Sequence, residues 1–419
     1  MQTRLSPEFA DTPEGREAEA ILRACVHCGF CTATCPTYQL LGDELDGPRG
    51  RIYQIKQVLE GTPATRSTQV HLDRCLSCRS CESTCPSGVS YGQLLDIGRR
   101  VVDAQVPRPL GERVARAALR EGLTSPLFAP ALRAGRALRA LVPASLRDKL
   151  AQPRPAGAWP AREHARKVLM PAGCVQPAMA PNIDAATARV LDAVGVQALR
   201  AQGGGCCGAI RQHNGDHAGA LDDMRRNVDA WWPLVAGGQI EAIVVNASGC
   251  GVMVKDYGRE LAADPAYADK AQRIAQLARD PIEFLAGAAA ALAARLGERA
   301  ELARRLGERG RARLAWHPPC TLQHGQRLGG RVEGLMRDLG FELTVPENSH
   351  LCCGSAGTYS LLQPQLSHQL RDNKLRSLAQ LEPERVLSAN IGCIQQLQSG
   401  SALPVQHWLE FLDEMLPSA

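Results

Sequence analysis

Cys25-Val-His-Cys28-Gly-Phe-Cys31-Thr-Ala-Thr-Cys35-Pro36 is the stretch that organises this chain, and Cys75-Leu-Ser-Cys78-Arg-Ser-Cys81-Glu-Ser-Thr-Cys85-Pro86 repeats it. Both stretches have the form C-x2-C-x2-C-x3-C-P, and each cysteine recurs 50 positions later. This is the bacterial run of thiolates that binds cubane [4Fe–4S] clusters. Two copies with identical spacing predict two such clusters.

The spacing also predicts which thiolates share a cluster. Three cysteines at two-residue gaps can wrap one cube, whereas the fourth cysteine of each run ligates the other cluster in two-cluster ferredoxins. We therefore expect Cys25, Cys28, Cys31 and Cys85 on the first cluster, and Cys75, Cys78, Cys81 and Cys35 on the second. A zinc site would favour cysteine pairs separated by a longer gap, and a disulfide framework would need an oxidising compartment.

The composition is that of an ordinary globular protein. The chain has 419 residues, 45% of them hydrophobic and 22% charged, and its length suggests about three domains. A net charge of +5 and an aromatic fraction of 4% argue against a nucleic-acid partner. We find neither a transmembrane run nor a signal peptide. Sixteen cysteines in such a chain indicate metal or redox use in the reducing cytoplasm.

Helical periodicity flanks both cysteine runs. Apolar residues at 52, 55, 58 and 59 predict a helix over 48–60, which Gly61 and Pro63 end. Residues 91–104 predict another helix, and the segment from Pro13 is weakly helical. We therefore interpret residues 1–104 as an α-helical ferredoxin module.

Residues 105–165 differ in composition, because arginines outnumber acids and prolines are scattered among them. Leucines lie between arginines in the helical stretch 128–142. One interpretation is a basic amphipathic surface for an anionic membrane or an acidic partner. The other is a solvated basic helical linker. The basic residues include Arg108, Arg113, Arg116, Arg120, Arg133, Arg136, Arg139, Arg147 and Lys149.

The rest of the chain contains a duplication marked by cysteines. The first copy has Cys174, Cys206-Cys207-Gly208 and Cys250, and the second has Cys320, Cys352-Cys353-Gly354 and Cys393. The lone cysteine precedes the pair by 32 positions in both copies, and the copies are offset by 146 at these two landmarks and by 143 at the third. Chance does not produce such a register readily.

Each copy predicts a strand–helix–strand–helix–strand order. Strands are expected over 167–174, 196–200 and 241–246, and again over 312–320, 341–345 and 385–390, with helices over 181–195 and 325–340 and after each Cys-Cys-Gly. This order predicts a short parallel sheet, with the cysteines at the carboxyl ends of strands, where open α/β sheets bind ligands. The predicted class is therefore α+α/β, with Cys-Cys-Gly domains over 166–281 and 312–419 and an exposed helical connector over 282–311.

The eight cysteines of the duplication have three interpretations. Vicinal thiolates can bind neighbouring iron atoms, so a third iron–sulfur cluster is one. The others are a set of redox-active or buried thiols and a relic of the duplicated ancestor. A cluster or redox role is favoured, because free thiols alone do not explain two copies in register. His317, three residues before Cys320, is a candidate to move protons beside such a site. Met253, Trp231 and Trp232 are expected in the core.

The sequence shows no catalytic motif that would act on an organic substrate. Gly203-Gly-Gly-Cys-Cys-Gly208 lacks the G-x-G-x-x-G spacing of a dinucleotide site. We find no phosphate-binding loop, zinc-protease motif or nucleophile elbow. No catalytic residue and no flavin or nucleotide site is therefore assigned, and hydride chemistry would need a flavin on another chain.

With these motifs in place, the chain resembles the iron–sulfur subunits of bacterial glycolate oxidases over nearly its whole length. Gly47-Pro-Arg-Gly-Arg51 between the two cysteine runs and Leu94-Leu-Asp-Ile-Gly98 after them carry the resemblance further. It implies partner subunits, one carrying FAD and the glycolate site. It also implies electron flow from the flavin through this chain to a membrane acceptor, a quinone, with the protein peripheral on the inner membrane.

Paired Cys-Cys-Gly domains also resemble those of the iron–sulfur subunit of anaerobic glycerol-3-phosphate dehydrogenase and of heterodisulfide reductase. The fullest such domains end in C-x-x-C, whereas Met253 and Gln396 stand at the last position here. Alternatives to electron transfer in glycolate oxidation are therefore a catalytic heterodisulfide or thiol reductase, a subunit of a related 2-hydroxy-acid or glycerol-3-phosphate dehydrogenase, and a scaffold with structural clusters.

Overall fold

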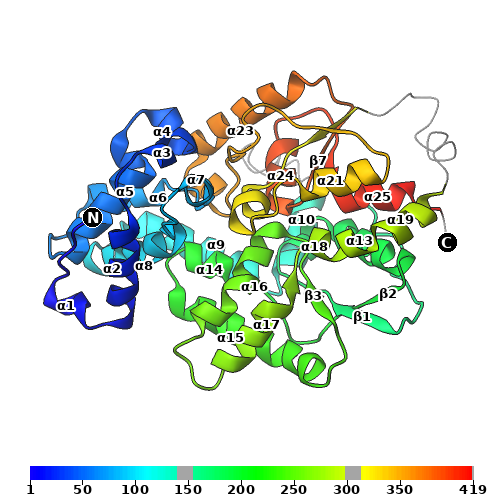
Figure 1. Ribbon diagram of the computed structural model, residues 1–419, viewed down its shortest axis with the longest axis horizontal. Coiled ribbons are helices and arrows are strands. Elements are labelled where there is room, and N and C mark those ends of the chain that lie inside the picture. Colours follow the sequence, from blue (N-terminus) through cyan, green and yellow to red (C-terminus); the bar gives the residue numbers. More distant parts are fainter. Residues whose placement is uncertain (139–153, 298–312, 418–419) are drawn as a thin grey trace.

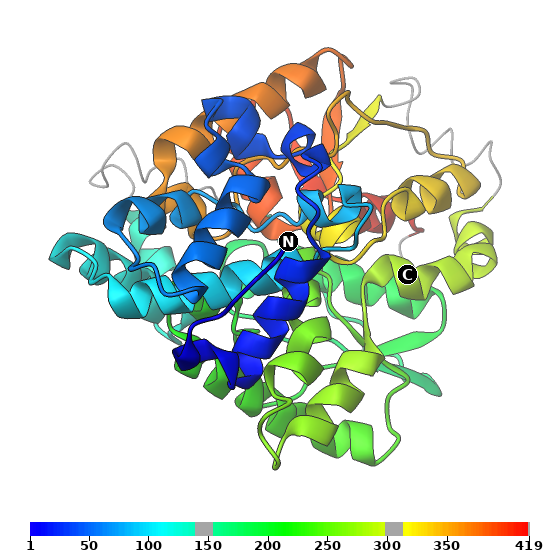
Figure 2. The same cartoon turned by 60° about the vertical axis from the view of Figure 1, so that its left-hand side comes forward.

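A computed structural model describes residues 1–138, 154–297 and 313–417 of the chain. A helical module forms one end of the molecule, and the two repeats lie side by side at the other end, so the chain termini lie at opposite ends (Figure 1). Seen from the amino-terminal side, the helices of the module lie in front of both repeats (Figure 2). The predicted α+α/β class is confirmed.

Short helices build the amino-terminal module around its own apolar core. Ile52, Ile55, Val58 and Leu59 are buried as the periodicity predicted, and they pack with Leu22, Leu94 and Leu95. The helices are α1 (Pro7–Ala10), α2 (Pro13–Ala24), α3 (Phe30–Ala33), α4 (Pro36–Leu41), η1 (Glu44–Asp46), α5 (Pro48–Leu59), α6 (Arg66–Asp73), α7 (Ser80–Thr84) and α8 (Tyr91–Gln105).

Each repeat contains a parallel sheet of four strands with the same strand order. The first is β2-β1-β3-β4, and the second is β6-β5-β7-β8. The strands are β1 (Arg166–Leu169), β2 (Val196–Leu199), β3 (Ala242–Val244), β4 (Ala278–Arg279), β5 (Leu314–Trp316), β6 (Leu343–Thr344), β7 (Arg385–Ser388) and β8 (Val405–His407). The fourth strand of each sheet was not predicted, since two or three residues carry no periodic signal.

Helices cover the sheets, and three predicted boundaries were wrong. The strands expected to reach Cys174 and Cys320 end at Leu169 and Trp316, so both cysteines lie on the loops beyond. The helix expected over 325–340 begins only at Arg331, because Gly330 adopts a left-handed φ of 79°. The helices are α12 (Gln176–Met179), α13 (Pro181–Ala193), α14 (Ala209–His213), α15 (His217–Ala236), α16 (Ser248–Glu260), α17 (Ala268–Leu277), η5 (Thr321–Gly325), α21 (Arg331–Asp338), α22 (Tyr359–Leu362), α23 (Pro364–Ala379), α24 (Ile391–Gln398) and α25 (Trp408–Met415).

The two repeats share one hydrophobic core. Val168 and Val190 of the first repeat belong to the same buried cluster as Trp316, Leu387 and Trp408 of the second. This continuous core fixes the two sheets relative to each other.

The start of the predicted connector also belongs to this core. After α18 (Pro281–Leu285) and η4 (Ala286–Ala288), helix α19 (Ala289–Leu296) buries Leu292 and Leu296 in it. The expectation of an exposed helix was therefore wrong for this part, because Leu292 and Leu296 are four residues apart and give the alanine-rich helix one apolar face. Residues 298–311 of the connector lie outside the described residues.

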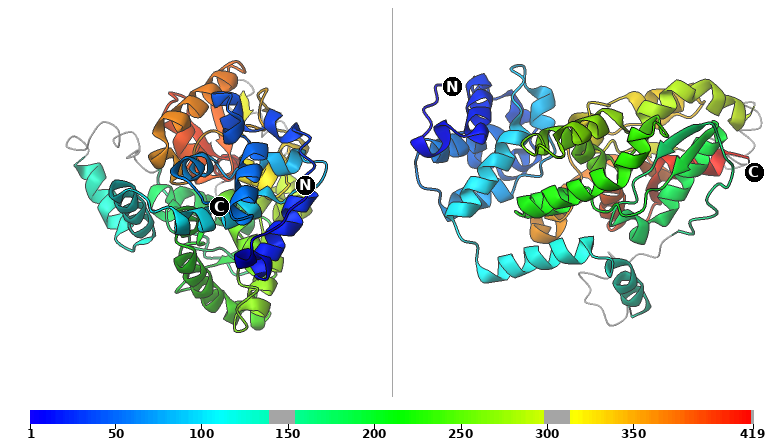
Figure 3. Two further views of the ribbon diagram at one scale, coloured as in Figure 1. Left: turned by 90° about the vertical axis from the view of Figure 1, so that its left-hand side faces the viewer. Right: turned by 90° about the horizontal axis from the view of Figure 1, so that it is seen from below.

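The basic segment after the module lies against the molecule. Helices α9 (Leu110–Thr124) and α10 (Phe128–Ala137) run beside the module and the first repeat (Figure 3). Arg108 and Arg116 form ion pairs with Asp73 at 2.5 and 3.0 Å. These two arginines therefore hold the segment against the amino-terminal module and do not belong to a solvated linker. Arg113 and Arg133 remain exposed, while Arg139, Arg147 and Lys149 lie outside the described residues. Within the described ranges no helix is both long enough and apolar enough to span a bilayer.

Candidate metal centres

The two amino-terminal cysteine loops have the same unusual backbone. His27 and Gly29 in the first loop and Ser77 and Arg79 in the second all adopt left-handed φ angles, between 52° and 86°. Three of these four residues have side chains, for which this conformation costs on the order of 1–3 kcal/mol each. Left-handed residues on both sides of the middle cysteine curl each loop, so that its three thiols face a common volume.

The first thiol group combines residues from both loops. Cys25, Cys28, Cys31 and Cys85 line one small cavity of about 30 Å³. Burial, together with the nearby thiols of Cys25, Cys28 and Cys85, raises the pKa of the Cys31 thiol to about 11. Cys85 therefore faces the first loop, as the predicted exchange of fourth ligands requires.

The second thiol group is the reciprocal one. Burial raises the pKa of the Cys81 thiol, and Cys78, Cys75 and Cys35 raise it further. Cys35, on the first run, thus lies with the three thiols of the second loop. The fold explains this grouping of the thiols, because α3 and α7 pack against each other and carry each fourth cysteine across to the other loop.

Polar groups point at the sulfur atoms of the second group. The Ser77 amide donates to Cys75 Sγ at 3.4 Å, the Tyr91 hydroxyl to the same sulfur at 3.6 Å, and Thr37 Oγ1 lies 3.3 Å from Cys35 Sγ. Hydrogen bonds to sulfur are one of the means by which proteins set the potential of an iron–sulfur cluster. This donor set fits a bound cluster rather than free thiols.

A buried cation lies beside this group. Arg51 is 1% exposed and donates to the His71 carbonyl at 2.7 Å, to Thr37 Oγ1 at 3.2 Å and to Asp46 at 3.3 Å. Asp46 also pairs with Arg74 at 2.8 Å. Arg51 is the last residue of the Gly47–Arg51 motif, to which the sequence assigned no role. Residue identity alone does not show whether an arginine is buried or exposed.

The first repeat also gathers its four cysteines. Hydrogen bonds from Cys174 and Cys207 lower the pKa of Cys206, and Cys207 contacts Cys250 in turn. The buried amide of Asn227 holds the pair by donating to the Cys206 carbonyl at 2.7 Å. These thiols lie beyond the carboxyl ends of β1, β2 and β3, as predicted.

The second repeat repeats this arrangement with deeper burial. Cys320 Sγ lies 3.8 Å from Cys352 Sγ, and Cys353 and Cys393 lie within 4.8 Å of each other and of a His317 ring nitrogen. All four cysteines are buried. The four thiols lie close to Lys374. Burial lowers the pKa of this lysine, and the negative charge of the thiolates raises it.

The positions that lack a cysteine in this chain have structural roles. Met253 and Trp231 are buried in the core of the first repeat, as predicted. Trp232, also expected in the core, is only half-buried. Gln396 is also buried and donates to Ser367 Oγ at 2.8 Å. The carboxylate and imidazole cluster Asp43, Asp46 and His71 could approach a metal ion, but Asp46 is already neutralised by two arginines.

One large cavity connects the three parts of the molecule. It has a volume of about 390 Å³ and is lined by cysteines of the second loop and of both repeats: Cys75, Cys78, Cys174, Cys206, Cys207, Cys250, Cys320, Cys352 and Cys393. Burial raises the pKa of Cys78, and the neighbouring Cys320 raises it further. The second loop therefore reaches the second repeat directly.

Specific contacts hold the module against both repeats. Arg79 forms an ion pair with Asp256 of the first repeat at 2.8 Å. Ser83 Oγ lies 2.7 Å from His324 Nδ1 of the second repeat, and the Tyr359 hydroxyl donates to the Arg74 carbonyl at 3.2 Å. These contacts fix the distance between the thiol groups.

Comparison with known protein families agrees with this organisation. Residues 21–89 match the family described as "4Fe-4S dicluster domain". Residues 168–255 and 314–398 each match the family described as "Cysteine-rich domain". The chain is thus an iron–sulfur protein with a duplicated cysteine-rich unit.

Curated relatives match nearly the whole chain or about half of it. The glycolate oxidase iron-sulfur subunit of Escherichia coli (strain K12) is 51% identical, over 99% of both chains. The probable glycolate oxidase iron-sulfur subunit of Bacillus subtilis (strain 168) is 27% identical, over 92% of this chain and 90% of the relative. Lactate utilization protein A of Bacillus subtilis (strain 168) is 26% identical over 55% of this chain and 90% of its own length.

Proposed function

Because this chain belongs to the family of glycolate oxidase iron–sulfur subunits, we propose that it carries electrons away from a flavoprotein partner that oxidises glycolate to glyoxylate. The end-to-end similarity to the Escherichia coli subunit is the observation that carries the proposal. The FAD and the glycolate site belong to partner subunits. The acceptor is a quinone, and the protein works in the cytoplasm, peripherally on the inner membrane.

The cofactors of this proposal are two [4Fe–4S] clusters. Cys25, Cys28, Cys31 and Cys85 hold one, and Cys75, Cys78, Cys81 and Cys35 hold the other. One-electron transfer is the chemistry that such clusters supply when bound. The gathered thiols and the sulfur-directed donors of Ser77, Tyr91 and Thr37 support this assignment.

The arrangement of thiol groups supports a direction through the molecule. Cys28 of the first group is exposed, and the neighbouring Val26 and Phe30 are 67% and 61% exposed, so this loop suits the entry of electrons from a partner. The second group lies between the first and the repeats, and Cys78 is next to Cys320. We retain residues 1–104, 105–165, 166–281, 282–311 and 312–419 as the proposed units of this path.

Reconstitution tests the proposal. We expect that the purified chain alone does not oxidise glycolate, and that adding the FAD-containing subunit makes glycolate bleach the visible absorption of its clusters. Glycolate oxidation by the isolated chain would contradict the assignment of substrate chemistry to a partner. Clusters that neither glycolate with the flavoprotein nor dithionite can reduce would instead support a structural scaffold.

A thiol or heterodisulfide reductase is the second candidate. It is favoured by one observation: Cys174 and Cys250 of the first repeat are half-buried and line the central cavity. Under that hypothesis Cys206→Ser abolishes activity with both cubanes intact. Under the electron-transfer hypothesis disulfide reduction is absent in the wild-type complex as well.

A further inference from the structure

The second repeat contains a histidine whose ring makes no hydrogen bond. His317 follows β5 and is 1% exposed. Among the described residues neither Nδ1 nor Nε2 has a hydrogen-bond partner. Leaving a buried polar atom unpaired costs about 1–3 kcal/mol, so an imidazole with two such nitrogens points to a ligand.

The main chain fixes the direction of this side chain. The His317 amide donates to the Leu387 carbonyl at 2.9 Å, and the Ser388 hydroxyl donates to the His317 carbonyl at 2.9 Å. Both partners lie on the neighbouring strand β7. The ring is therefore aimed by the sheet rather than by contacts of its own nitrogens.

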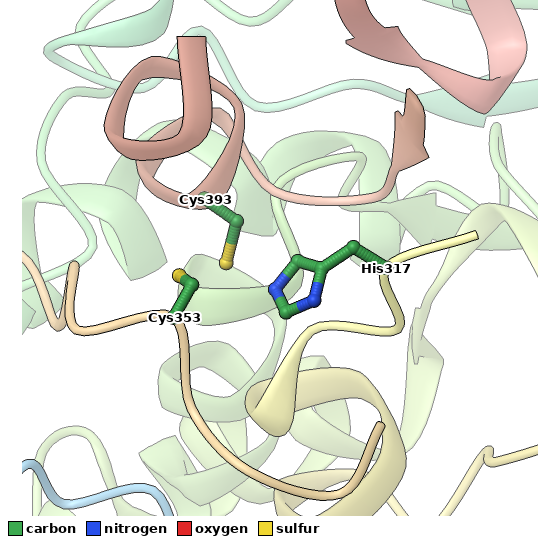
Figure 4. Close-up of side chains that lie close together, drawn as sticks. All are labelled: His317, Cys353 and Cys393. Atoms are coloured by element: carbon green, nitrogen blue, oxygen red, sulfur yellow. The ribbon is translucent and has the colours of Figure 1, made fainter. Parts of the chain in front are cut away.

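The ring is aimed at two thiols. The His317, Cys353 and Cys393 side chains converge from three different segments (Figure 4), and their ligand atoms lie within 4.8 Å of one another. In a tetrahedral site with metal–sulfur bonds of about 2.3 Å and metal–nitrogen bonds of about 2.0–2.1 Å, neighbouring ligand atoms lie roughly 3.5–3.8 Å apart. The observed spacing needs only small side-chain rotations to bind one metal.

We propose that His317, Cys353 and Cys393 bind one metal atom through one imidazole nitrogen and two thiolates, in a centre distinct from the two cubanes. Cys352, whose side chain contacts Cys353, supplies the fourth ligand of this tetrahedral site. Iron and zinc are the metals that accept this mixture of imidazole and thiolate ligands. The inference concerns the chain's own residues and does not depend on glycolate as substrate.

The surroundings of the site suit a centre rich in thiolates. Lys374 is 4% exposed and lies close to these cysteines. A neutral imidazole also adds no negative charge to the group, unlike a further thiolate. The first repeat differs, because Pro171 stands at the position that corresponds to His317. The two repeats therefore do not carry the same site, and the histidine ligand belongs to the second.

The full chain, purified without oxygen, tests the site. We expect metal beyond the roughly eight irons of two cubanes. If it is zinc, X-ray absorption at the zinc edge should show a nitrogen neighbour at about 2.0–2.1 Å. If it is iron, pulsed EPR of the reduced protein should show a nitrogen coupling that changes when histidine is labelled with ¹⁵N. Wild-type protein with only the cubane irons, or with no nitrogen signal in either arm, overturns the proposal.

Variants assign the nitrogen to one residue. His317→Ala should lose the additional metal and the nitrogen signal while retaining the cubane irons, and His317→Cys should recover the metal without the nitrogen. His324→Gln is the matched control, because its two ring nitrogens already contact Ser83 and the His350 carbonyl; its metal content should equal the wild-type value. A nitrogen signal that persists in His317→Ala overturns the assignment. Should this variant not fold, the isotope comparison in the wild-type chain decides.

Discussion

Replacing Arg51 by methionine should lower the reduction potential of the second cluster and leave the first unchanged. Arg51 is fully buried, and its guanidinium contacts Thr37, whose hydroxyl contacts Cys35 Sγ; the two distances are 3.2 and 3.3 Å. Reduction adds one negative charge, which a neighbouring cation stabilises. Arg74 continues to neutralise Asp46 in the variant, so the net change is the loss of one positive charge.

The size of the effect follows from Coulomb's law. Two unit charges about 8 Å apart interact by about 2 kcal/mol at an effective dielectric constant of about 20. For a one-electron couple about 60 mV corresponds to about 1.4 kcal/mol, so the potential of the second cluster should fall by about 90 mV. Arg51→Lys keeps the charge and should change the potential by less than about a third of this amount.

Redox titration monitored by EPR measures both clusters in the same sample. Arg49→Met is the matched control: this arginine lies two positions away, its side chain is 36% exposed, and it pairs with Glu44 at 2.6 Å. Solvent screens an exposed charge, so this variant should not move the potential of the second cluster by more than about 20 mV. The control applies to the second cluster, because Arg49 lines the cavity of the first thiol group. Equal shifts of both clusters in Arg51→Met, or no shift of the second, would refute the reasoning.

Three further predictions follow from the described contacts. Cys85→Ser and Cys35→Ser should each remove about four of about eight irons. Cys85→Ser should abolish the EPR signal of the first cluster, and Cys35→Ser that of the second. Loss of the same signal in both variants would contradict the exchange of fourth ligands. Gly354→Ala should lower the free energy of unfolding, measured by denaturant titration, more than Gly208→Ala does. Both glycines adopt left-handed φ angles, which cost a non-glycine residue about 1–2 kcal/mol, but the new Cβ would lie 2.5 Å from a main-chain carbonyl oxygen at Gly354 and 3.0 Å from one at Gly208. An equal loss of stability in the two variants would count against the clash. Burial raises the pKa of Asp280 to about 7, so this carboxyl group binds a proton more tightly in the native state than in the unfolded chain. The free energy of unfolding should therefore fall by about 1 kcal/mol between about pH 6 and pH 8. Asp280→Asn should remove this fall in thermal unfolding scans, and an unchanged pH dependence would show that another group titrates.

The sequence alone predicted the parts of this molecule that depend on local spacing. The two cysteine runs, the helix over 48–60 and the register of the duplication are visible because they repeat at fixed intervals. The parallel sheets followed from the order of strands and helices, which leaves few topologies. The short edge strands β4 and β8 were not predicted, because hydrogen bonds to the neighbouring strands β3 and β7 define them and their own few residues carry no pattern.

The centres themselves combine what spacing could and could not reveal. The position of Cys85 beside the first loop and of Cys35 beside the second was predictable, since a single loop cannot easily supply all four corners of a cube. The roles of Arg51 and His317 were not, because a buried cation and a free imidazole are defined by residues far away in sequence.

Burial and direction are therefore the properties that only the tertiary structure decided. The sequence determined that the chain carries iron–sulfur motifs and a duplicated cysteine-rich unit. The packing of the module on both repeats determined that the second thiol group lies next to the second repeat, and the hydrogen bonds of β5 to β7 determined that one histidine faces two thiols. Long-range contacts of this kind leave no periodic trace in a sequence, because the energy of each depends on two segments and not on one.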